Sequence, residues 1–492
     1  MLRILRDPAT GIVVDLHQAA IPDEVDHGPS LAAMTALESG SMANADEQRR
    51  VGHYWLRAPS TAPELEISRA ITDSWTSIEQ VDAQGFDTIL QIGIGGSALG
   101  PELVIDALGN GRGRRFVLLD TVDPPRIQKV LESIHPEKTL VIVASKSGGT
   151  QETMTALGIV EAYYAASGLC FDDHALAVTG PDSSLAHRAK GWRATLPVWD
   201  WVGGRTSITS AVGLLPMHLC GIDFRAFLEG AASVDAWTRQ SAPQNPAAQL
   251  AALWASAGHH TAAILPYSDH LRVLGRYLQQ LVMESLGKSV GRSGATQNYG
   301  LSVLGNKGSA DQHALVQQLR DGPTGVINHV IHVGQAYQSD PLLKDAGDLQ
   351  FALMTGTQQA LAEVDRPVVS IGLPQLDAAR LGGLIALFER VVGLTAELKD
   401  INAYHQPGVE AGKREAKHQL TVLNAIYDFL NSQHVTSVSA GSTADEIGKA
   451  IGIEPAIVWR LSSHLSQSGR VQLTPGKSPS EDRFQAVEKS AK

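Results

Sequence analysis

Short apolar runs alternate with amphipathic stretches through most of the chain. Buried strands are predicted at residues 88–94, 115–120, 140–144 and 174–179, and again at 261–265, 329–333 and 367–371. Helical spacing of apolar residues predicts helices at residues 67–81, 102–108, 271–286 and 381–398. Strands that alternate with helices indicate doubly wound parallel sheets. The two series of strands therefore predict an α/β protein with two such subdomains, joined near residues 220–250 by a proline-containing break.

The two ends of the chain have a different character. The N-terminal residues have weak periodicity, which predicts an arm or helical cap on the main body. From about residue 419, two short helical patterns flank Gly452 and precede a strand-like run at 470–474, the outline of a winged helix-turn-helix. The predicted domains are an N-terminal arm, two α/β subdomains and a winged-helix-like extension, at residues 1–62, 63–235, 236–418 and 419–492.

A glycine-rich junction follows the first predicted strand, in the sequence TILQIGIGGSALGPEL at residues 88–103. The strand ends in glycines that include Gly96, Ser97 follows, and Pro101 is predicted in the first turn of the next helix. Free N–H groups and the positive dipole end of a helix start attract anions. We therefore expect a phosphate site at the carboxyl end of this strand.

The same loop also fits a dinucleotide-binding pattern. Residues 93–98 match G-x-G-x-x-A, and Asp120 ends the second predicted strand, where a ribose-binding carboxylate could stand. On this loop alone, an NAD-dependent oxidoreductase of the Rossmann type is the first interpretation.

A second polar loop follows the third predicted strand and argues against the dinucleotide interpretation. It places Ser145, Lys146, Ser147 and Thr150 with two glycines at a strand-to-helix junction. Hydroxyls, a lysine and free N–H groups supply many donors for one phosphate. A dinucleotide enzyme needs no second loop of this kind, whereas a phosphomonoester site built from two neighbouring strand ends does. The pair of loops therefore favours a phosphomonoester ligand.

Two later stretches carry groups suited to acid–base chemistry. Arg205 follows two glycines and could reach a site as a fixed cation, although its spacing alone fits a surface arginine in a turn. Gln280 and Glu284 share one polar stripe of an amphipathic helix predicted over residues 271–288. That stripe is either a solvated row of mutual ion pairs or a face that presents Glu284 to a cleft as a general base.

Two further basic residues are ambiguous. Ser309 and Gln312 predict a capping box, which would place His313 in the first turn of a helix and keep its imidazole neutral. A lone histidine is nevertheless more often structural than catalytic. Lys413, in the sequence HQPGVEAGKREAK, is either a cleft lysine or part of a charged helix face.

Composition narrows the class of protein. The net charge of −11 argues against a general nucleic-acid binder. In the C-terminal stretch the acidic and basic residues balance, so we expect that stretch to be a packing module and not a DNA-binding domain. Two cysteines fit a reducing cytosol. The N-terminus has no apolar segment of signal-peptide length, and the apolar run 381–398 contains charges typical of a buried helix. We expect a soluble, cytoplasmic protein without membrane contact.

Five stretches together resemble the glucose-6-phosphate isomerase (phosphoglucose isomerase) family. They occur in the family's order between residues 88 and 417, and any one alone could arise by chance whereas the ordered set could not. They are GIGGSALGP, SKSGGTQET, DWVGGRTSITSAVGL, QQLVMESLGKSV with GSADQHALVQQLRDG, and QPGVEAGKREA.

The resemblance implies a fold of two sugar-isomerase-type subdomains and an aldose–ketose isomerase of glycolysis and gluconeogenesis, acting through ring opening and a cis-enediol(ate). It implies a homodimer in which the partner subunit supplies the ring-opening histidine, and it requires no metal or organic cofactor. Catalysis would fall to Glu284, His313, Lys413 and Arg205. Phosphate binding would fall to Ser97, Ser145, Lys146, Ser147 and Thr150. Substrate hydroxyls would be held by Gly96, Gln280 and Gln406.

Two alternative functions remain open on the sequence. The Rossmann oxidoreductase explains residues 93–98 and Asp120 but not the second phosphate loop. A non-catalytic sugar-phosphate sensor with a DNA-binding tail explains the loops and the winged-helix outline, but it gives no reason for Arg205, Glu284 and His313 together. We therefore favour the isomerase.

Overall fold

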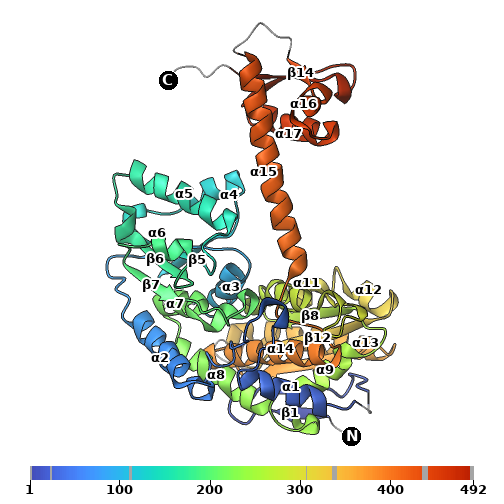
Figure 1. Ribbon diagram of the computed structural model, residues 1–492. Coiled ribbons are helices and arrows are strands. Elements are labelled where there is room, and N and C mark those ends of the chain that lie inside the picture. The colour runs from blue at the N-terminus through green and yellow to red at the C-terminus, as the bar shows by residue number, and fades with distance from the viewer. Residues whose placement is uncertain are drawn as a thin grey trace. The chain divides into compact units, whose positions relative to one another are not determined.

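The chain forms two compact units, residues Met1–His405 and Gln406–Lys492. The computed structural model describes residues 3–22, 25–109, 113–305, 307–334, 341–434 and 441–487 (Figure 1). The first unit contains helices on two mainly parallel sheets, which confirms the predicted α/β class. The second unit contains a long helix with a small α/β module.

A five-stranded parallel sheet forms the first half of unit 1. Its strands lie in the order β4-β3-β5-β6-β7, at Arg115–Leu119, Thr88–Ile92, Thr139–Ser145, Ala175–Thr179 and Ala194–Pro197. The four predicted strands of this region are confirmed, and each lies parallel to its neighbours. Every residue of β3 and β5 is buried, as expected for strands covered on both faces. The half-buried β7 was not predicted, because its four residues carry no continuous apolar run.

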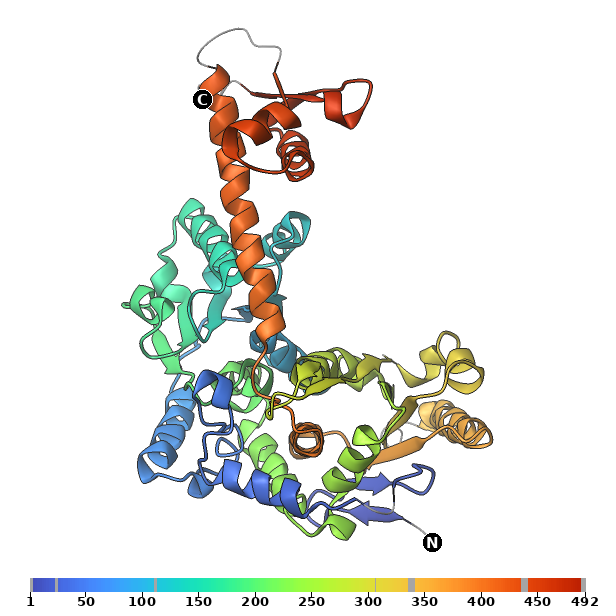
Figure 2. The ribbon, with the colours of Figure 1, turned by 45° about the vertical axis from the view of Figure 1, so that its right-hand side comes forward.

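A six-stranded sheet forms the second half of unit 1. Its order is β1-β2-β13-β12-β8-β11, at Ile4–Arg6, Val13–Asp15, Val368–Leu373, Val326–Val333, Thr261–Tyr267 and Ser302–Leu304. The four later strands are mutually parallel, whereas β1 and β2 add antiparallel at one edge (Figure 2). The N-terminal segment thus supplies an edge of this sheet as well as helix α1, and three-residue strands are too short to give a periodic signal.

The helices of unit 1 connect and cover these strands. They are α1 Gly28–Glu38, α2 Leu65–Glu79, α3 Gly96–Leu108, α4 Pro124–Glu132, α5 Gln151–Ala166, α6 Ser184–Arg188, α7 Ala211–Leu219, α8 Phe224–Trp237, α9 Pro246–Ala255, α10 Leu274–Leu278, α11 Gly308–Asp311, α12 Val316–Asp321, α13 Lys344–Ala362 and α14 Ala378–Leu398.

The apolar helix α14 lies in the core of unit 1, packed against α8 and α9. Its two buried charges are paired: Glu389 contacts Arg57, and Arg390 lies 3.1 Å from Asp235. Arg57 also lies 2.8 Å from Asp235, so the four groups form one buried network. Buried charges require such partners because desolvation is costly. No helix in the part of the chain that the structure describes is long and apolar enough to cross a membrane.

Unit 2 has the predicted winged-helix-like topology. Its elements are α15 Pro407–His434, α16 Ala444–Ile451, α17 Pro455–Gln467, β14 Ser442–Thr443, β15 Val471–Thr474 and β16 Arg483–Ala486. The side chain of Thr443 caps α16 in a capping box with Glu446, and Gly452 ends the helix in the left-handed conformation. An apolar core of its own holds the unit together, and α15 continues through residue 419 without a break.

Candidate active site

The glycine-rich junction joins β3 to α3. The helix begins at Gly96, so Ser97 lies in its first turn, whereas Pro101 lies inside the helix and not in its first turn as predicted. Proline has no N–H, so it cannot donate to the carbonyl oxygen of Ser97 four residues earlier. The buried side chain of Gln91 donates to that oxygen instead, at 2.8 Å, which explains how the helix tolerates the proline.

The second polar loop joins β5 to α5. Ser145 is the last residue of β5, and its hydroxyl lies 3.2 Å from that of Thr150, the N-cap residue of α5. Ser147 is exposed, and its hydroxyl accepts from the backbone N–H of Gly149 at 3.2 Å. Because β3 and β5 are adjacent parallel strands, both loops lie at one edge of the sheet.

The amine of Lys146 points toward the segment 200–202. It donates to the carbonyl oxygens of Asp200 and Val202, at 2.6 and 2.9 Å, and lies 3.4 Å from the Asp200 carboxylate. Burial and the nearby Arg49 guanidinium lower the pKa of Lys146 to about 8. The loop therefore holds a lysine that changes charge near physiological pH.

Arg205 is buried in a short 3-10 helix, η5 (Gly204–Thr209), beside the first loop. A Cβ on Gly96 would lie only 1.9 Å from the carbonyl oxygen of Gly204, so the two backbones are in direct contact. The Nε of Arg205 lies 3.7 Å from the Glu284 carboxylate, and its Nη2 donates to the carbonyl oxygen of His405 at 3.4 Å. Burial lowers the pKa of Arg205. Arg205 is therefore a fixed cation and not a surface residue.

Glu284 lies at the end of a π-helix, η8 (Gln279–Glu284), which continues α10. Within the described residues, the side chains of the predicted polar stripe do not form ion pairs with one another. Arg276 pairs instead with Glu102 and Asp120, at 3.2 and 2.9 Å. Gln280 faces the first loop, since a Cβ on Gly95 would lie 3.0 Å from its Nε2. π-turns are frequent at functional sites.

Lys288 closes this helical segment. Its buried amine donates to the carbonyl oxygens of Glu284 and Ser285, at 2.8 and 2.7 Å. Burial and the positive charge of Arg205 lower the pKa of Lys288 to about 8. The backbone of Glu284 is thus held by one cation while its carboxylate faces another.

His313 lies in an exposed turn between α11 and α12. The predicted capping box is wrong, because α11 begins after Lys307 and its backbone N–H donates to the side chain of Asp311, at 2.9 Å. Within the described residues the imidazole of His313 has no hydrogen-bond or ionic partner. The structure therefore does not bring His313 into contact with Glu284.

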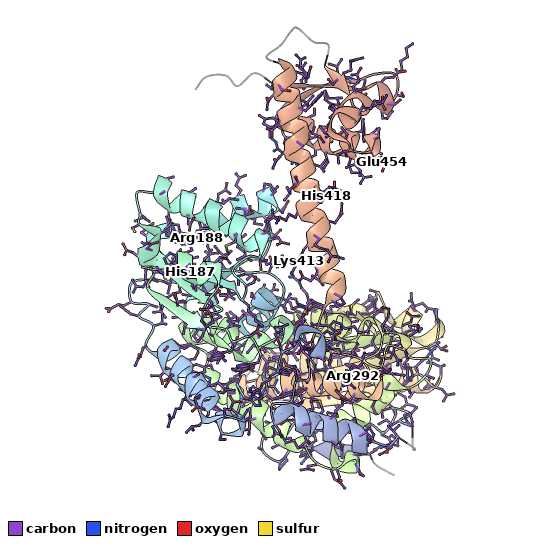
Figure 3. The ribbon with its side chains drawn as sticks, viewed as in Figure 1. His187, Arg188, Arg292, Lys413, His418 and Glu454 are labelled. Carbon is purple, nitrogen blue, oxygen red and sulfur yellow. The ribbon has the colours of Figure 1, made fainter. Side chains whose placement is uncertain are left out.

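Gln406 and Lys413 belong to unit 2. Lys413 is exposed on α15, where its amine lies 2.8 Å from the carboxylate of Glu410 (Figure 3). The carbonyl oxygen of Gln406 accepts from the backbone N–H of Val409 at 3.2 Å. The described residues contain no group of three or more His, Cys, Asp and Glu side chains placed to hold a metal ion.

Sequence reasoning missed the residues that support these groups. Gln91, Asp200 and Lys288 each contact a predicted site residue, and Arg49 contacts Asp200, yet no role was assigned to any of the four from the sequence. Lys288 is four residues after Glu284 and falls on the same face of the helix predicted over residues 271–288, and this spacing is a sequence signal that could have found it.

This arrangement has the parts that an acid–base reaction on an anionic substrate needs. Two loops with several hydroxyls and a lysine lie at one sheet edge, and a half-buried carboxylate lies beside a buried guanidinium next to them. A carboxylate can move a proton, and a fixed cation can stabilise the oxyanion that results.

Comparison with known proteins agrees with this chemistry. The family model for phosphoglucose isomerase matches residues 28–441. A glucose-6-phosphate isomerase of Geobacter sulfurreducens is 43% identical over 482 residues, covering 91% of this chain and 90% of that protein. One from a Synechococcus strain is 45% identical over 469 residues, covering 90% and 88%. The crystal structure of a Chlamydia trachomatis glucose-6-phosphate isomerase matches with a TM-score of 0.78 at 27% identity, covering 86% and 90%. This chain belongs to the phosphoglucose isomerase family.

Proposed function

We propose that this chain is a glucose-6-phosphate isomerase, which interconverts glucose 6-phosphate and fructose 6-phosphate through ring opening and a cis-enediol(ate). The observation that carries the proposal is the Glu284 carboxylate 3.7 Å from the buried Arg205 guanidinium, beside two adjacent phosphate-type loops. Family membership supports the substrate class, and the role given to each residue is part of the proposal.

The phosphate binds to the two loops. Adjacent hydroxyls and the lysine are arranged around one edge of the sheet, and the start of α5 adds free N–H groups. Binding the phosphate away from the reacting carbons gives energy that positions the sugar. The phosphate ligands are Ser97, Ser145, Lys146, Ser147 and Thr150. The sugar hydroxyls contact Gly96, Gln280 and Gln406.

Glu284 moves the proton between C1 and C2 of the open-chain sugar. Its carboxylate takes the proton from one carbon and returns it to the other, while electron density shifts onto the oxygen of the carbonyl group. Arg205, buried and positively charged, stabilises the negative enediolate oxygen. The hydrogen bonds of Lys288 to the end of η8 keep the carboxylate in place.

His313 opens the sugar ring, with Lys413 assisting, and it does so in the active site of a second copy of the chain. The exposed position of His313 supports this arrangement. The neighbouring Gln312 donates to the carbonyl oxygen of Leu353 at 2.9 Å, on a helix with further exposed apolar side chains. The exposed apolar residues on α13 and on the preceding 3-10 helix, η9 (Pro341–Leu343), are Leu342, Leu343, Leu349, Phe351 and Leu353. An apolar surface of this kind suits a subunit interface.

The first experiment measures conversion of fructose 6-phosphate to glucose 6-phosphate without added metal or NAD(P) in the isomerase step. The Glu284→Gln variant should lose about 10²- to 10⁴-fold in kcat while substrate affinity stays close to that of the unchanged protein, because Glu284 acts on carbon and not on phosphate. Equal loss of binding and turnover would show that Glu284 has another role.

Mixing two inactive variants tests the shared site. In a heterodimer of Glu284→Gln and His313→Ala chains, one of the two sites combines an intact Glu284 with an intact partner histidine. We expect activity to return after the two variants are unfolded and refolded together. If each site used its own His313, the mixture would stay inactive.

Two sequence-based alternatives have less support. The Rossmann interpretation assigned Asp120 to a ribose, but this carboxylate is 2.9 Å from Arg276. For the DNA-binding sensor, the acidic and basic residues of unit 2 nearly balance in the sequence, which provides no excess of positive charge for nucleic acid. A cytoplasmic location, supported by the two free cysteines, and the subdomain boundaries at 62, 235 and 418 remain predictions.

A further inference from the structure

A turn in the N-terminal segment, residues 44–49, connects the two cations of the site. An antiparallel bridge between Asn44 and Arg49 closes the turn, with their backbones hydrogen bonded in both directions at 3.1 Å. A 3-10 helix, η1 (Ala45–Glu47), lies inside it, and Gln48 takes the left-handed conformation that reverses the chain. The segment lies in unit 1, far in sequence from any motif of the site.

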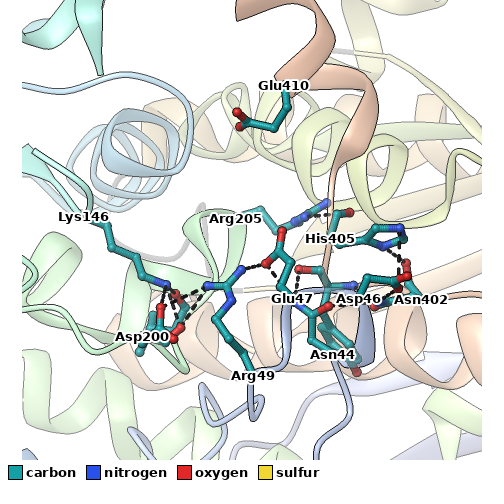
Figure 4. A network of polar contacts seen from close by, with 12 residues as sticks. Asn44, Asp46, Glu47, Arg49, Lys146, Asp200, Arg205, Asn402, His405 and Glu410 are labelled. Carbon is teal, nitrogen blue, oxygen red and sulfur yellow. Dashed lines mark hydrogen bonds and ion pairs between the residues drawn. The ribbon is translucent and has the colours of Figure 1, made fainter. Parts of the chain in front are cut away.

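One end of the 44–49 turn contacts the residue that accepts from the amine of Lys146 (Figure 4). The guanidinium of Arg49 donates to the carbonyl oxygen of Asp200 at 3.0 Å and lies 3.5 Å from its carboxylate. The same carbonyl oxygen accepts from Lys146 at 2.6 Å. Glu47 pairs with Arg49 and fixes its orientation from within the turn. Arg49 therefore acts on Lys146 through Asp200.

The other end of the turn contacts the residues that hold Arg205 in place. The side chain of Asn402 donates to Asn44 at 2.9 Å and to Asp46 at 2.5 Å. The Asp46 carboxylate also lies 3.7 Å from the ring of His405, whose carbonyl oxygen accepts from Arg205. Asn44 and Asn402 are both buried, so this end is fixed.

We propose that the 44–49 turn is a positioning element that sets the distance between Lys146 and Arg205. The inference rests on the proposed function, in which Lys146 binds the phosphate and Arg205 stabilises the enediolate at the other end of the sugar. Lys146 follows the end of β5, whereas Arg205 follows the 200–204 segment. The distance between these two cations must match the distance between the phosphate and the reacting carbons of the substrate. A misplacement of the order of 1 Å costs about 100-fold in rate, so a fixed spacer between them has a direct effect on turnover.

The contacts of the turn suit this role better than a role in stability. The side chain of Asp200 is 75% exposed and that of Arg49 is 21% exposed. Exposed ion pairs contribute little to folding. Substitution of Arg49 should therefore leave the fold intact and change only the placement of Lys146.

The test uses the full-length chain and compares four variants with the unchanged protein. Arg49→Gln releases Asp200 and Lys146, and Asp46→Ala releases His405. Arg49→Lys keeps the charge but not the forked contact. Arg50→Gln is the matched control, because Arg50 carries the same charge on the same segment and pairs with the exposed Glu64 at 2.7 Å.

We expect Arg49→Gln to raise the KM for fructose 6-phosphate about tenfold, with a smaller change in kcat, and Arg49→Lys to restore part of the affinity. Asp46→Ala should instead lower kcat about tenfold, because it displaces Arg205, the cation that stabilises the enediolate. Arg50→Gln should match the unchanged protein. Melting temperatures of the variants identify any loss of fold, and the milder Asp46→Asn then replaces Asp46→Ala.

The pH dependence separates positioning from general loosening. The charged groups that face Lys146 are Asp200, which raises its pKa, and Arg49, which lowers it. Removal of Arg49 should therefore raise the pKa of Lys146, so that the KM begins to rise at a higher pH. Loss of stability does not produce this shift.

If the unchanged protein is active but Arg49→Gln and Asp46→Ala are both indistinguishable from Arg50→Gln, the inference is overturned and the proposed function is not. An inactive unchanged protein overturns the proposed function, and the inference with it.

Discussion

Replacement of Gly96 by alanine tests how closely the phosphate loop must approach Arg205. A Cβ at this position would lie 1.9 Å from the carbonyl oxygen of Gly204 and 2.9 Å from the backbone nitrogen of Arg205. Both neighbours are backbone atoms, which cannot rotate away as a side chain can. Contacts of real Cβ atoms essentially never fall below 3.0 Å, so the start of α3 and the start of η5 must separate by about 1 Å.

This separation should lower kcat about 100-fold, because a displacement of about 1 Å moves Arg205 away from the position it needs in the transition state. Overpacking should also cost about 1–3 kcal/mol of stability. The assay measures kcat and KM for fructose 6-phosphate on the folded protein, well below the melting temperature. Urea unfolding gives the change in stability separately.

Gly158→Ala is the matched control, because a Cβ on Gly158 meets no atom within 4 Å and lies on α5 away from the loops. Its kcat should equal that of the unchanged protein. If Gly96→Ala retains kcat within about twofold, the contact between the two loops does not position Arg205 and the reasoning is refuted.

Three further outcomes follow from the structure. Because the pKa of Lys146 is lowered to about 8, its amine loses its charge as pH rises through 8, and the KM for the sugar phosphate should rise in that range but stay flat in Lys146→Arg. Arg57→Met removes the arginine that pairs with the buried Glu389 and leaves Asp235 paired with Arg390 alone, so urea unfolding should show a loss of about 3–5 kcal/mol. Removal of residues 420–492 deletes the separate apolar core of unit 2, and kcat/KM should stay within about threefold of that of the full chain.

The buried strands could be predicted from the sequence, but the edges of the sheets could not. β3 and β5 are continuous apolar runs bounded by polar loops, so length and composition identified them. β1 and β2 have three residues each; β1 pairs with β2, and β2 pairs with β13, more than 350 residues later in the chain. Local patterns do not contain that pairing, which depends on tertiary contacts.

Local helix geometry was also beyond the sequence. The spacing of Gln280 and Glu284 predicted a regular helix, yet the segment contains a π-turn, which adds a residue to the turn without a change in composition. Ser309 and Gln312 fit a capping box, but Asp311 caps the backbone instead. Both patterns found the right segment and gave the wrong backbone geometry.

Four basic side chains in the candidate site provide local positive charge in a protein that is acidic as a whole: Lys146, Lys288, Arg49 and Arg205. Burial and a neighbouring arginine together lower the pKa values of Lys146 and Lys288 to about 8; the arginine is Arg49 for Lys146 and Arg205 for Lys288. The protein as a whole carries a net charge of −11, but the charge that acts on a bound ligand is local. A phosphate bound at Lys146 would reduce the repulsion between this amine and Arg49 and would favour the charged form of the lysine. The burial that lowers the pKa of Lys146 therefore also strengthens its attraction to a bound anion.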